Sequence, residues 1–81
     1  MNKQMTLTIA GVLDREGLVA ELWHCDEQWG EIFQAGEYLR LALYPNPNQT
    51  FWNFDAEDAA NAIREAKERL LDDEMRFSEA A

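Results

Sequence analysis

The sequence is short of the residues on which most catalytic and metal chemistry depends. Its 81 residues include one histidine, His24, and one cysteine, Cys25. A lone cysteine excludes an intrachain disulfide, which is typical of proteins kept in a reducing compartment. One histidine, one cysteine and dispersed acids provide no metal-ligand spacing. We therefore expect a cytoplasmic protein without a metal or another cofactor.

Basic residues are also scarce. Seven Lys and Arg residues stand against 16 Asp and Glu residues, so the net charge is −9. Such a chain repels nucleic-acid backbones and anionic membrane surfaces. No apolar run approaches the roughly 20 residues that a membrane-spanning helix needs. The sequence therefore predicts neither direct nucleic-acid binding nor a membrane partner.

The apolar content is sufficient for one folded domain. Hydrophobic residues make up 47% of the chain, and three Trp, two Tyr and four Phe are among them. This composition argues against disorder, and a chain of this length makes a single domain over residues 1–81.

Four segments have the pattern of β-strands. Apolar and polar residues alternate along them, which is the period of a strand with one buried face. The predicted strands are Met5–Val12, Leu18–Cys25, Trp29–Gln34 and Glu37–Tyr44. The short connections between consecutive strands favour an antiparallel meander.

Helical periodicity appears at the C-terminal end. Turn-forming residues stop the strand pattern after Tyr44, and Phe51–Phe54 forms either a short fifth strand or a packed loop. Asp55 is a suitable N-cap for a helix from Ala56 to about Glu74, and residues 77–81 should fray. We therefore predict an α+β fold, in which an antiparallel meander of four or five strands carries one C-terminal amphipathic helix on one face.

Strand parity gives the sheet one aliphatic face, because successive side chains of a strand point to opposite sides. This face should pack against the apolar stripe of the helix and form the core. Its members are Leu7, Ile9, Leu18, Ala20, Leu22, Ile32, Leu39, Leu41 and Leu43, and those of the stripe are Ala59, Ala62, Ile63, Ala66 and Leu70.

The opposite face is aromatic and charged. The predicted helix can cover only one face, so these aromatic side chains should stay partly exposed, and interfaces favour such residues. The candidate binding residues are Glu21, Trp23, Trp29, Glu31, Phe33, Tyr38, Arg40 and Tyr44. We therefore predict a noncatalytic protein-interaction module that binds another protein or a second copy of itself through this face.

A tight turn would fix the register on this face. A two-residue turn at Ala35-Gly36 sets Phe33 opposite Tyr38 and Glu31 opposite Arg40. Aromatic then meets aromatic and opposite charges meet, which stabilises a strand pair. A bulge in either strand would invert the faces beyond it.

Two residue pairs invite a catalytic interpretation, and geometry opposes both. His24 and Cys25 are consecutive strand residues, so their side chains point to opposite faces and the thiol should be partly buried. Glu21 and Glu31 share a face and could act as the two carboxylates of a hydrolase. Such chemistry needs a cleft of about 300–1,000 Å³, which one sheet and one helix rarely enclose. We therefore expect no enzymatic activity.

Two alternatives stay open. In the first, the segment with Phe51, Trp52 and Phe54 folds over the aromatic face as a second small core. In the second, the chain is an acidic inhibitor, of the antitoxin, immunity or phage-encoded kind, that mimics nucleic acid or neutralises a basic partner. The carboxylates of that surface would be Glu16, Glu21, Glu27, Glu31 and Glu37. Binding by charge weakens steeply as salt rises, whereas aromatic packing barely responds.

One stretch resembles a known family. From Asp55 to Leu71, an acidic cap leads into a helix rich in Ala, Glu and Arg. This stretch is similar to the helix that follows the strands in HicB-type antitoxins. The resemblance covers less than a quarter of the chain, and the four preceding strands depart from that family's pattern, so no function is carried over.

Overall fold

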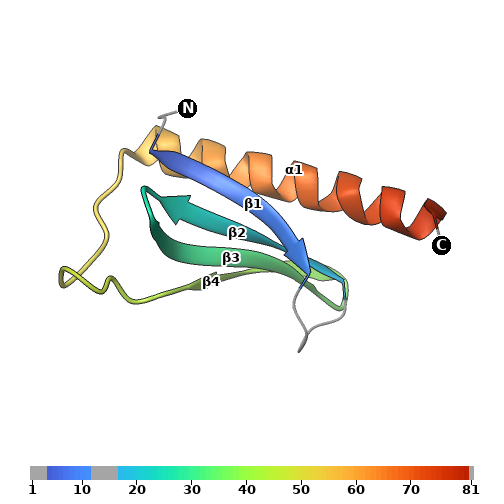
Figure 1. Cartoon of the computed structure of the whole chain (residues 1–81), viewed down its shortest axis with the longest axis horizontal. Coiled ribbons are helices and arrows are strands. Elements are labelled where there is room, and N and C mark those ends of the chain that lie inside the picture. Colours follow the sequence, from blue (N-terminus) through green and yellow to red (C-terminus); the bar gives the residue numbers. More distant parts are fainter. Residues whose placement is uncertain (1–3, 12–16, 81) are drawn as a thin grey trace.

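The computed structural model describes residues 4–11 and 17–80, and the side chains of its helix as far as residue 72. In the described chain, four antiparallel strands form one sheet and one helix lies across it (Figure 1). The elements are β1 (Met5–Gly11), β2 (Leu18–His24), β3 (Glu27–Ala35), β4 (Tyr38–Leu43) and α1 (Ala56–Ala80). The predicted α+β meander with a C-terminal helix is confirmed.

Several element bounds differ from the predicted ones. β3 begins at Glu27 rather than Trp29, because the tight turn after β2 lets strand pairing start at once. The segment Phe51–Phe54 is a loop and adds no fifth strand to the described sheet. α1 extends to Ala80, past the predicted end near Glu74.

The strand order in the sheet is β1-β2-β3-β4, and two tight turns connect β2 to β3 and β3 to β4. Cys25 and Gly36 each take the first position of a two-residue turn, with φ angles of 56° and 63°. A positive φ at this position matches the twist of the paired strands, and it is the reason that such turns favour glycine. Cys25 accepts this conformation although it has a side chain, and its N–H donates to the Gln4 carbonyl at 2.7 Å.

The β3–β4 pair has another register than the predicted one. The turn is Gly36-Glu37, one position later than expected. Phe33 therefore lies opposite Arg40 rather than Tyr38, and Glu31 does not lie opposite Arg40. Both predicted cross-strand pairs are wrong, because glycine takes the first turn position and not the second. The assignment of these β4 side chains to faces is unchanged.

β3 contains a bulge where it leaves β2. Leu22 pairs with Gly30, whereas the next residue, Trp23, pairs with Gln28. Trp29 is the extra residue, and an extra residue interrupts the alternation of side chains between the two faces. As a result, Trp29 joins the core on the α1 side of the sheet.

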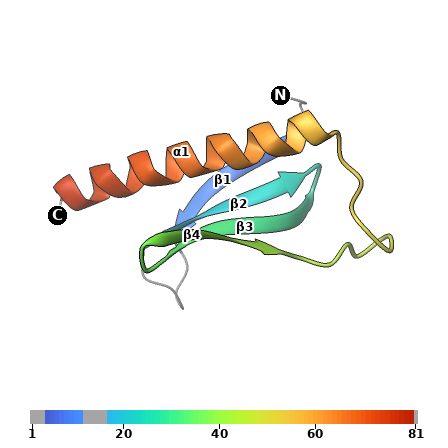
Figure 2. The ribbon, with the colours of Figure 1, turned by 180° about the vertical axis from the view of Figure 1, so that it is seen from behind.

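α1 packs over β1 and β2, and its contacts with β3 are few (Figure 2). The core joins the aliphatic face to the apolar stripe of the helix. Its buried members are Met5, Ala20, Leu22, Trp29, Ile32, Ala62, Ala66 and Leu70, and the side chains packed around them are Leu7, Ile9, Leu18, Leu39, Trp52, Phe54 and Ile63.

The first turn of α1 is capped as predicted. The Asp58 N–H donates to the Asp55 carboxylate at 3.1 Å, and the Ala59 N–H donates to the Asp55 carbonyl at 3.0 Å. An aspartate in this position satisfies backbone donors that the helix itself cannot pair. The cap fixes the point at which the loop after β4 becomes helical.

Candidate protein-interaction surface

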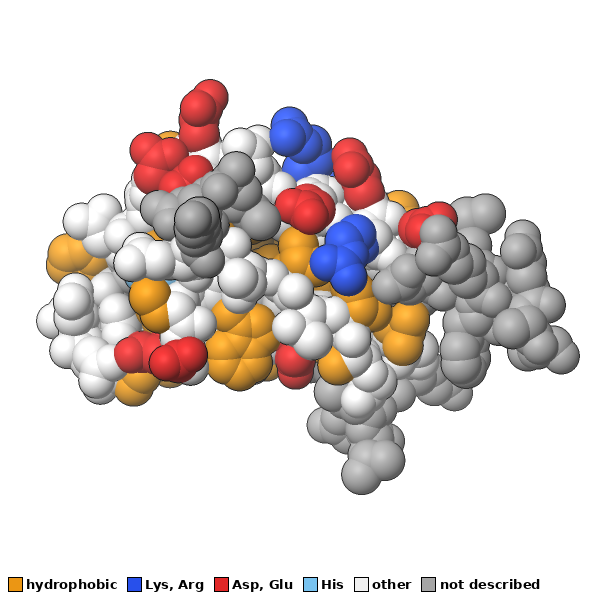
Figure 3. Space-filling view, turned by 45° about the horizontal axis from the view of Figure 1, so that its top comes forward, with side chains coloured by type: hydrophobic (Ala, Val, Ile, Leu, Met, Phe, Trp, Pro, Cys, Tyr) orange, Lys and Arg blue, Asp and Glu red, His pale blue; other side chains and the backbone are white. Residues whose placement is uncertain are grey.

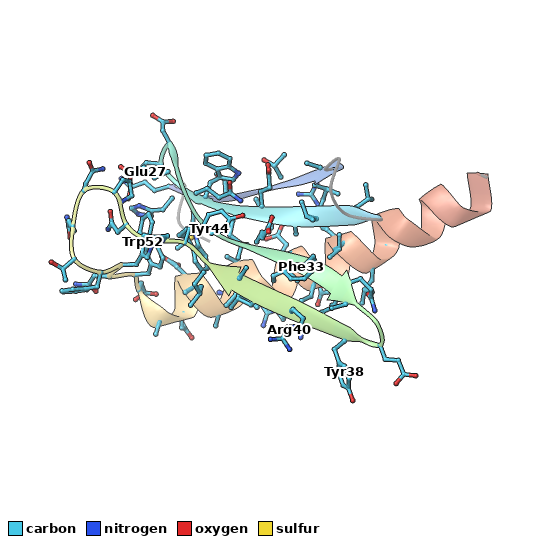
Figure 4. The ribbon with its side chains drawn as sticks, turned by 90° about the horizontal axis from the view of Figure 1, so that it is seen from below. Glu27, Phe33, Tyr38, Arg40, Tyr44 and Trp52 are labelled. Carbon is cyan, nitrogen blue, oxygen red and sulfur yellow. The ribbon has the colours of Figure 1, made fainter. Side chains whose placement is uncertain are left out.

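The face of the sheet turned away from α1, called the open face below, carries most of the predicted binding residues. Parity and the observed pairing place there Glu21, Trp23, Glu31, Phe33, Tyr38, Arg40 and, just after β4, Tyr44. Figure 4 shows this face, with Phe33, Arg40 and Tyr38 along its β3–β4 side.

Trp29 is the one predicted binding residue that lies elsewhere. It is 4% exposed and belongs to the core, where its ring centroid lies 5.0 Å from that of Phe54. The prediction that Trp29 stands on the exposed aromatic face is wrong, because the bulge in β3 turns its side chain toward α1. The alternation of residue types in β3 does not reveal this bulge.

The accessible part of the open face lies on β4. Tyr38 is 73% exposed, and Arg40 is exposed beside it. The other predicted aromatics, Trp23, Phe33 and Tyr44, are half-buried. They can widen a contact that is centred on Tyr38, but they offer less free area than the sequence predicts.

Two predicted carboxylates form a like-charged pair. Glu21 and Glu31 lie directly opposite each other across β2 and β3. Glu21 is half-buried and Glu31 is buried. Neither residue lines the three hollows described in the following paragraphs.

The loop between β4 and α1 closes one end of the core. Trp52 and Phe54 pack against the core cluster, and the Phe54 ring centroid lies 5.0 Å from the rings of both Trp29 and His24. The Trp52 Nε1–H donates to the Tyr44 carbonyl at 2.8 Å, and Figure 4 shows the two residues side by side. The loop thus covers Trp29, and the accessible part of the open face stays uncovered by it.

His24 and Cys25 differ in their surroundings. His24 ends β2 and packs against Phe54, whereas Cys25 lies in the turn and is exposed. The prediction of a partly buried thiol at a strand end is wrong, because the strand stops one residue earlier than expected. Both residues line a hollow of about 290 Å³ next to the loop, and a second hollow of about 210 Å³ adjoins His24 and Asp55.

The main feature that the sequence did not reveal is an uncovered groove beside β4. Leu41 is 43% and Leu43 is 67% exposed, although both were predicted to be core residues. A groove of about 400 Å³ runs between β4 and α1. Its apolar lining consists of Ile32, Leu39, Leu41, Ile63 and Leu71.

Dimensions explain why this groove is open. Neighbouring strands lie about 4.8 Å apart, so a four-stranded sheet is nearly 20 Å wide. A helix with its side chains is only about 10–12 Å across. One helix therefore covers two strands, and α1 covers β1 and β2. The sequence does contain a signal for this exposure: it predicts four strands and only one helix to cover them.

We call the exposed apolar residues around β4 the β4 surface: Tyr38, Leu41 and Leu43 from β4, and Leu71 from α1. β4 is also an edge strand of the described sheet. Its exposed leucines lie on the α1 side of the sheet and Tyr38 lies on the open face, so exposed apolar residues stand on both sides of the free edge.

The charges of the molecule lie mostly elsewhere. Figure 3 shows acidic side chains spread over α1, with Lys and Arg among them. Within β4 the one charged residue is Arg40, and the groove adds Glu37 and Lys67. The β4 surface is thus apolar with a slight basic character in a strongly acidic chain.

Within the described residues, no helix is long and apolar enough to cross a membrane, and no group of three or more His, Cys, Asp or Glu is placed to hold a metal ion. Comparisons of the chain with protein families, with curated proteins and with solved structures find no match.

Proposed function

We propose that this chain is a noncatalytic protein-interaction module that binds its partner through the β4 surface. The observation that carries the proposal is the position of α1, which packs on β1 and β2 and leaves the apolar residues of β4 exposed. Single exposed leucines are common on protein surfaces. Several large apolar side chains around one edge strand form a patch, and patches of this kind mark interaction sites.

The aromatic residues of the open face have a supporting part in this proposal. Tyr38 is the most exposed of them and lies next to the β4 leucines in sequence, so it would serve as an anchor. Phe33 lies near it on β3, opposite Arg40, whereas Tyr44 lies at the other end of β4. Arg40 would set the orientation of the partner more than it would add affinity.

A second candidate function is that of an acidic inhibitor of a basic partner. The Glu21–Glu31 pair supports it, because two acidic residues lie directly opposite each other on the open face of a strongly acidic chain. Glu27 begins β3 and Glu37 lies in the turn after it, whereas Glu16 lies outside the described residues. This candidate uses the acidic residues and not the β4 surface.

Affinity capture from the native host distinguishes the two proposals. We expect the tagged full chain to retain its partner at low and high salt, and Leu43→Lys to lose it. Thr8→Lys is the matched control, because Thr8 is exposed on β1 and the change in net charge is identical. A partner that is released by salt and retained by Leu43→Lys would contradict the β4 proposal and favour the acidic inhibitor.

A further inference from the structure

We propose that the partner of the β4 surface is a second copy of this chain, paired antiparallel through β4. A two-fold axis at Leu41 would join the two sheets into one continuous sheet. This inference rests on the proposed function and adds the identity and register of the partner. A two-fold dimer needs only one self-complementary patch, and β4 has such a patch.

The backbone of β4 is prepared for this pairing. The Tyr44 N–H donates to the Trp29 carbonyl at 3.0 Å, so the even-numbered residues of β4 direct their backbone groups to β3. The odd-numbered residues Leu39, Leu41 and Leu43 then direct their N–H and C=O groups to the free edge. No described strand pairs with them there.

The side chains of β4 complement a second copy in one register. When Leu41 lies opposite Leu41 of the partner subunit, Leu39 lies opposite Leu43 of the partner subunit. On the open face, Tyr38 then meets Tyr44 of the partner subunit, and Arg40 meets Ala42 of the partner subunit. Leucine meets leucine, tyrosine meets tyrosine, and no like charges are opposed, which are the pairings that stabilise a sheet.

The neighbouring registers that keep the two faces aligned are worse. In one of them Arg40 lies opposite Arg40 of the partner subunit, where like charges repel. In the other, Leu39 lies opposite Pro45 of the partner subunit, which has no N–H to donate. The register centred on Leu41 is therefore the best-matched one.

The other edge of the sheet lacks these features. β1 presents Thr6 and Thr8 as exposed residues, and its apolar residues Leu7 and Ile9 are partly buried against the core. The edge of β1 therefore offers backbone groups without an exposed apolar row. This difference favours β4 as the strand that self-associates.

Charge gives the association a recognisable salt dependence. Two chains of net charge −9 repel each other, although β4 itself carries only Arg40. Salt screens this long-range repulsion and leaves apolar packing almost unchanged. We therefore expect the dimer to tighten as the salt concentration rises, which is the opposite of charge mimicry.

Sedimentation equilibrium on the full chain tests the pairing. One strand pair makes a small interface, so we expect dissociation constants on the order of 10 μM. Leu43→Lys should raise the dissociation constant at least tenfold, and Thr8→Lys should leave it within twofold. Circular dichroism of both variants checks that the fold is kept.

Disulfide trapping tests the register in a Cys25→Ser background. Leu41→Cys should form a disulfide-linked dimer on mild oxidation, because residue 41 meets its own symmetry mate. Leu43→Cys should not, because Leu43 would face Leu39 of the partner subunit. Equal trapping of both variants, or trapping of Arg40→Cys in their place, would overturn the register.

The two proposals fail in different ways. A wild-type chain that sediments as a monomer at every concentration and salt overturns self-pairing, while β4-dependent capture of another protein would still support the interaction module. A dimer that is weakened by Thr8→Lys and unaffected by Leu43→Lys would overturn both, since association would then occur at the β1 edge.

Discussion

The two halves of the sheet have similar strand patterns and different surroundings. In β1 and β2, the aliphatic residues of the face that is turned toward α1 are buried or half-buried beneath the helix. In β4, Leu41 and Leu43 alternate in the same way and are exposed. The alternation of a strand thus decides which face is apolar, and the width of the covering helix decides which part of that face becomes core.

The largest difference in stability between the covered and the exposed half is expected at two adjacent leucines of α1. Leu70 is 0% exposed under the covered half, whereas Leu71 is 46% exposed above the groove. We expect Leu70→Ala to lower the free energy of unfolding by about 2–4 kcal/mol, as buried leucine truncations do. Leu71→Ala should change it by less than about 0.5 kcal/mol, as expected for an exposed position.

Urea denaturation of both variants measures these differences. Equal losses at the two positions would show that the groove beside β4 is closed by further packing. A small loss at Leu70 would show that α1 does not anchor on β1 and β2 through this residue.

A second test changes the contact between β4, in the exposed half, and its neighbour β3. An added Cβ at Gly30 would lie 2.7 Å from the Ala42 carbonyl oxygen, so β4 must move away from β3. We expect Gly30→Ala to destabilise the fold by about 1–3 kcal/mol, the usual cost of overpacking. At Gly11 on β1 an added Cβ meets no described atom within 4 Å, so Gly11→Ala should be nearly neutral.

Thermal unfolding of the two glycine variants decides this point. A Gly30→Ala protein as stable as wild type would mean that β3 and β4 are not held as closely as the structure shows. That result would also weaken the assignment of the β4 edge, because the same strand pair determines which backbone groups point outward.

The smallest effect is expected at the turn that joins the two halves. Cys25 has a φ of 56°, whereas the equivalent position of the next turn is glycine. The left-handed backbone conformation costs a residue with a side chain about 1–2 kcal/mol, and glycine avoids this cost. Part of the gain is lost, because glycine has more conformational entropy to lose on folding. We therefore expect Cys25→Gly to raise the free energy of unfolding by about 0.5–1 kcal/mol.

Asp26→Gly is the control for this turn, because Cys25 is the one described residue other than glycine with positive φ. A gain for Asp26→Gly and none for Cys25→Gly would contradict the turn geometry. Chemical denaturation resolves both changes when the protein concentration is held constant.

Much of the fold could be predicted from local sequence patterns. The strands, their order and the Asp55 cap depend on alternation and capping, which act between near neighbours. The turn at Gly36-Glu37 was misplaced by one residue, because Ala35-Gly36 and Gly36-Glu37 both contain glycine and only backbone geometry separates them. A shift of one turn position changed every predicted cross-strand pair between β3 and β4.

The candidate site was harder to predict. Strand parity assigns Trp29 to the wrong face, because a bulge depends on pairing between distant residues and does not alter the periodic pattern of β3. Strand parity assigns Leu41 and Leu43 to the core, because their alternation matches that of Leu7 and Ile9. Their exposure follows from the placement of α1 over β1 and β2, which is a property of the whole fold.

Amide hydrogen exchange of the wild-type chain at two protein concentrations tests whether the free edge of β4 pairs with a second copy. We expect the amides of Leu39, Leu41 and Leu43 to become protected at the higher concentration and to exchange freely on dilution. The amides of Leu7 and Ile9, on the outer edge of β1, should exchange at one rate in both samples. Unchanged exchange of the three β4 amides at both concentrations would contradict self-association through this strand.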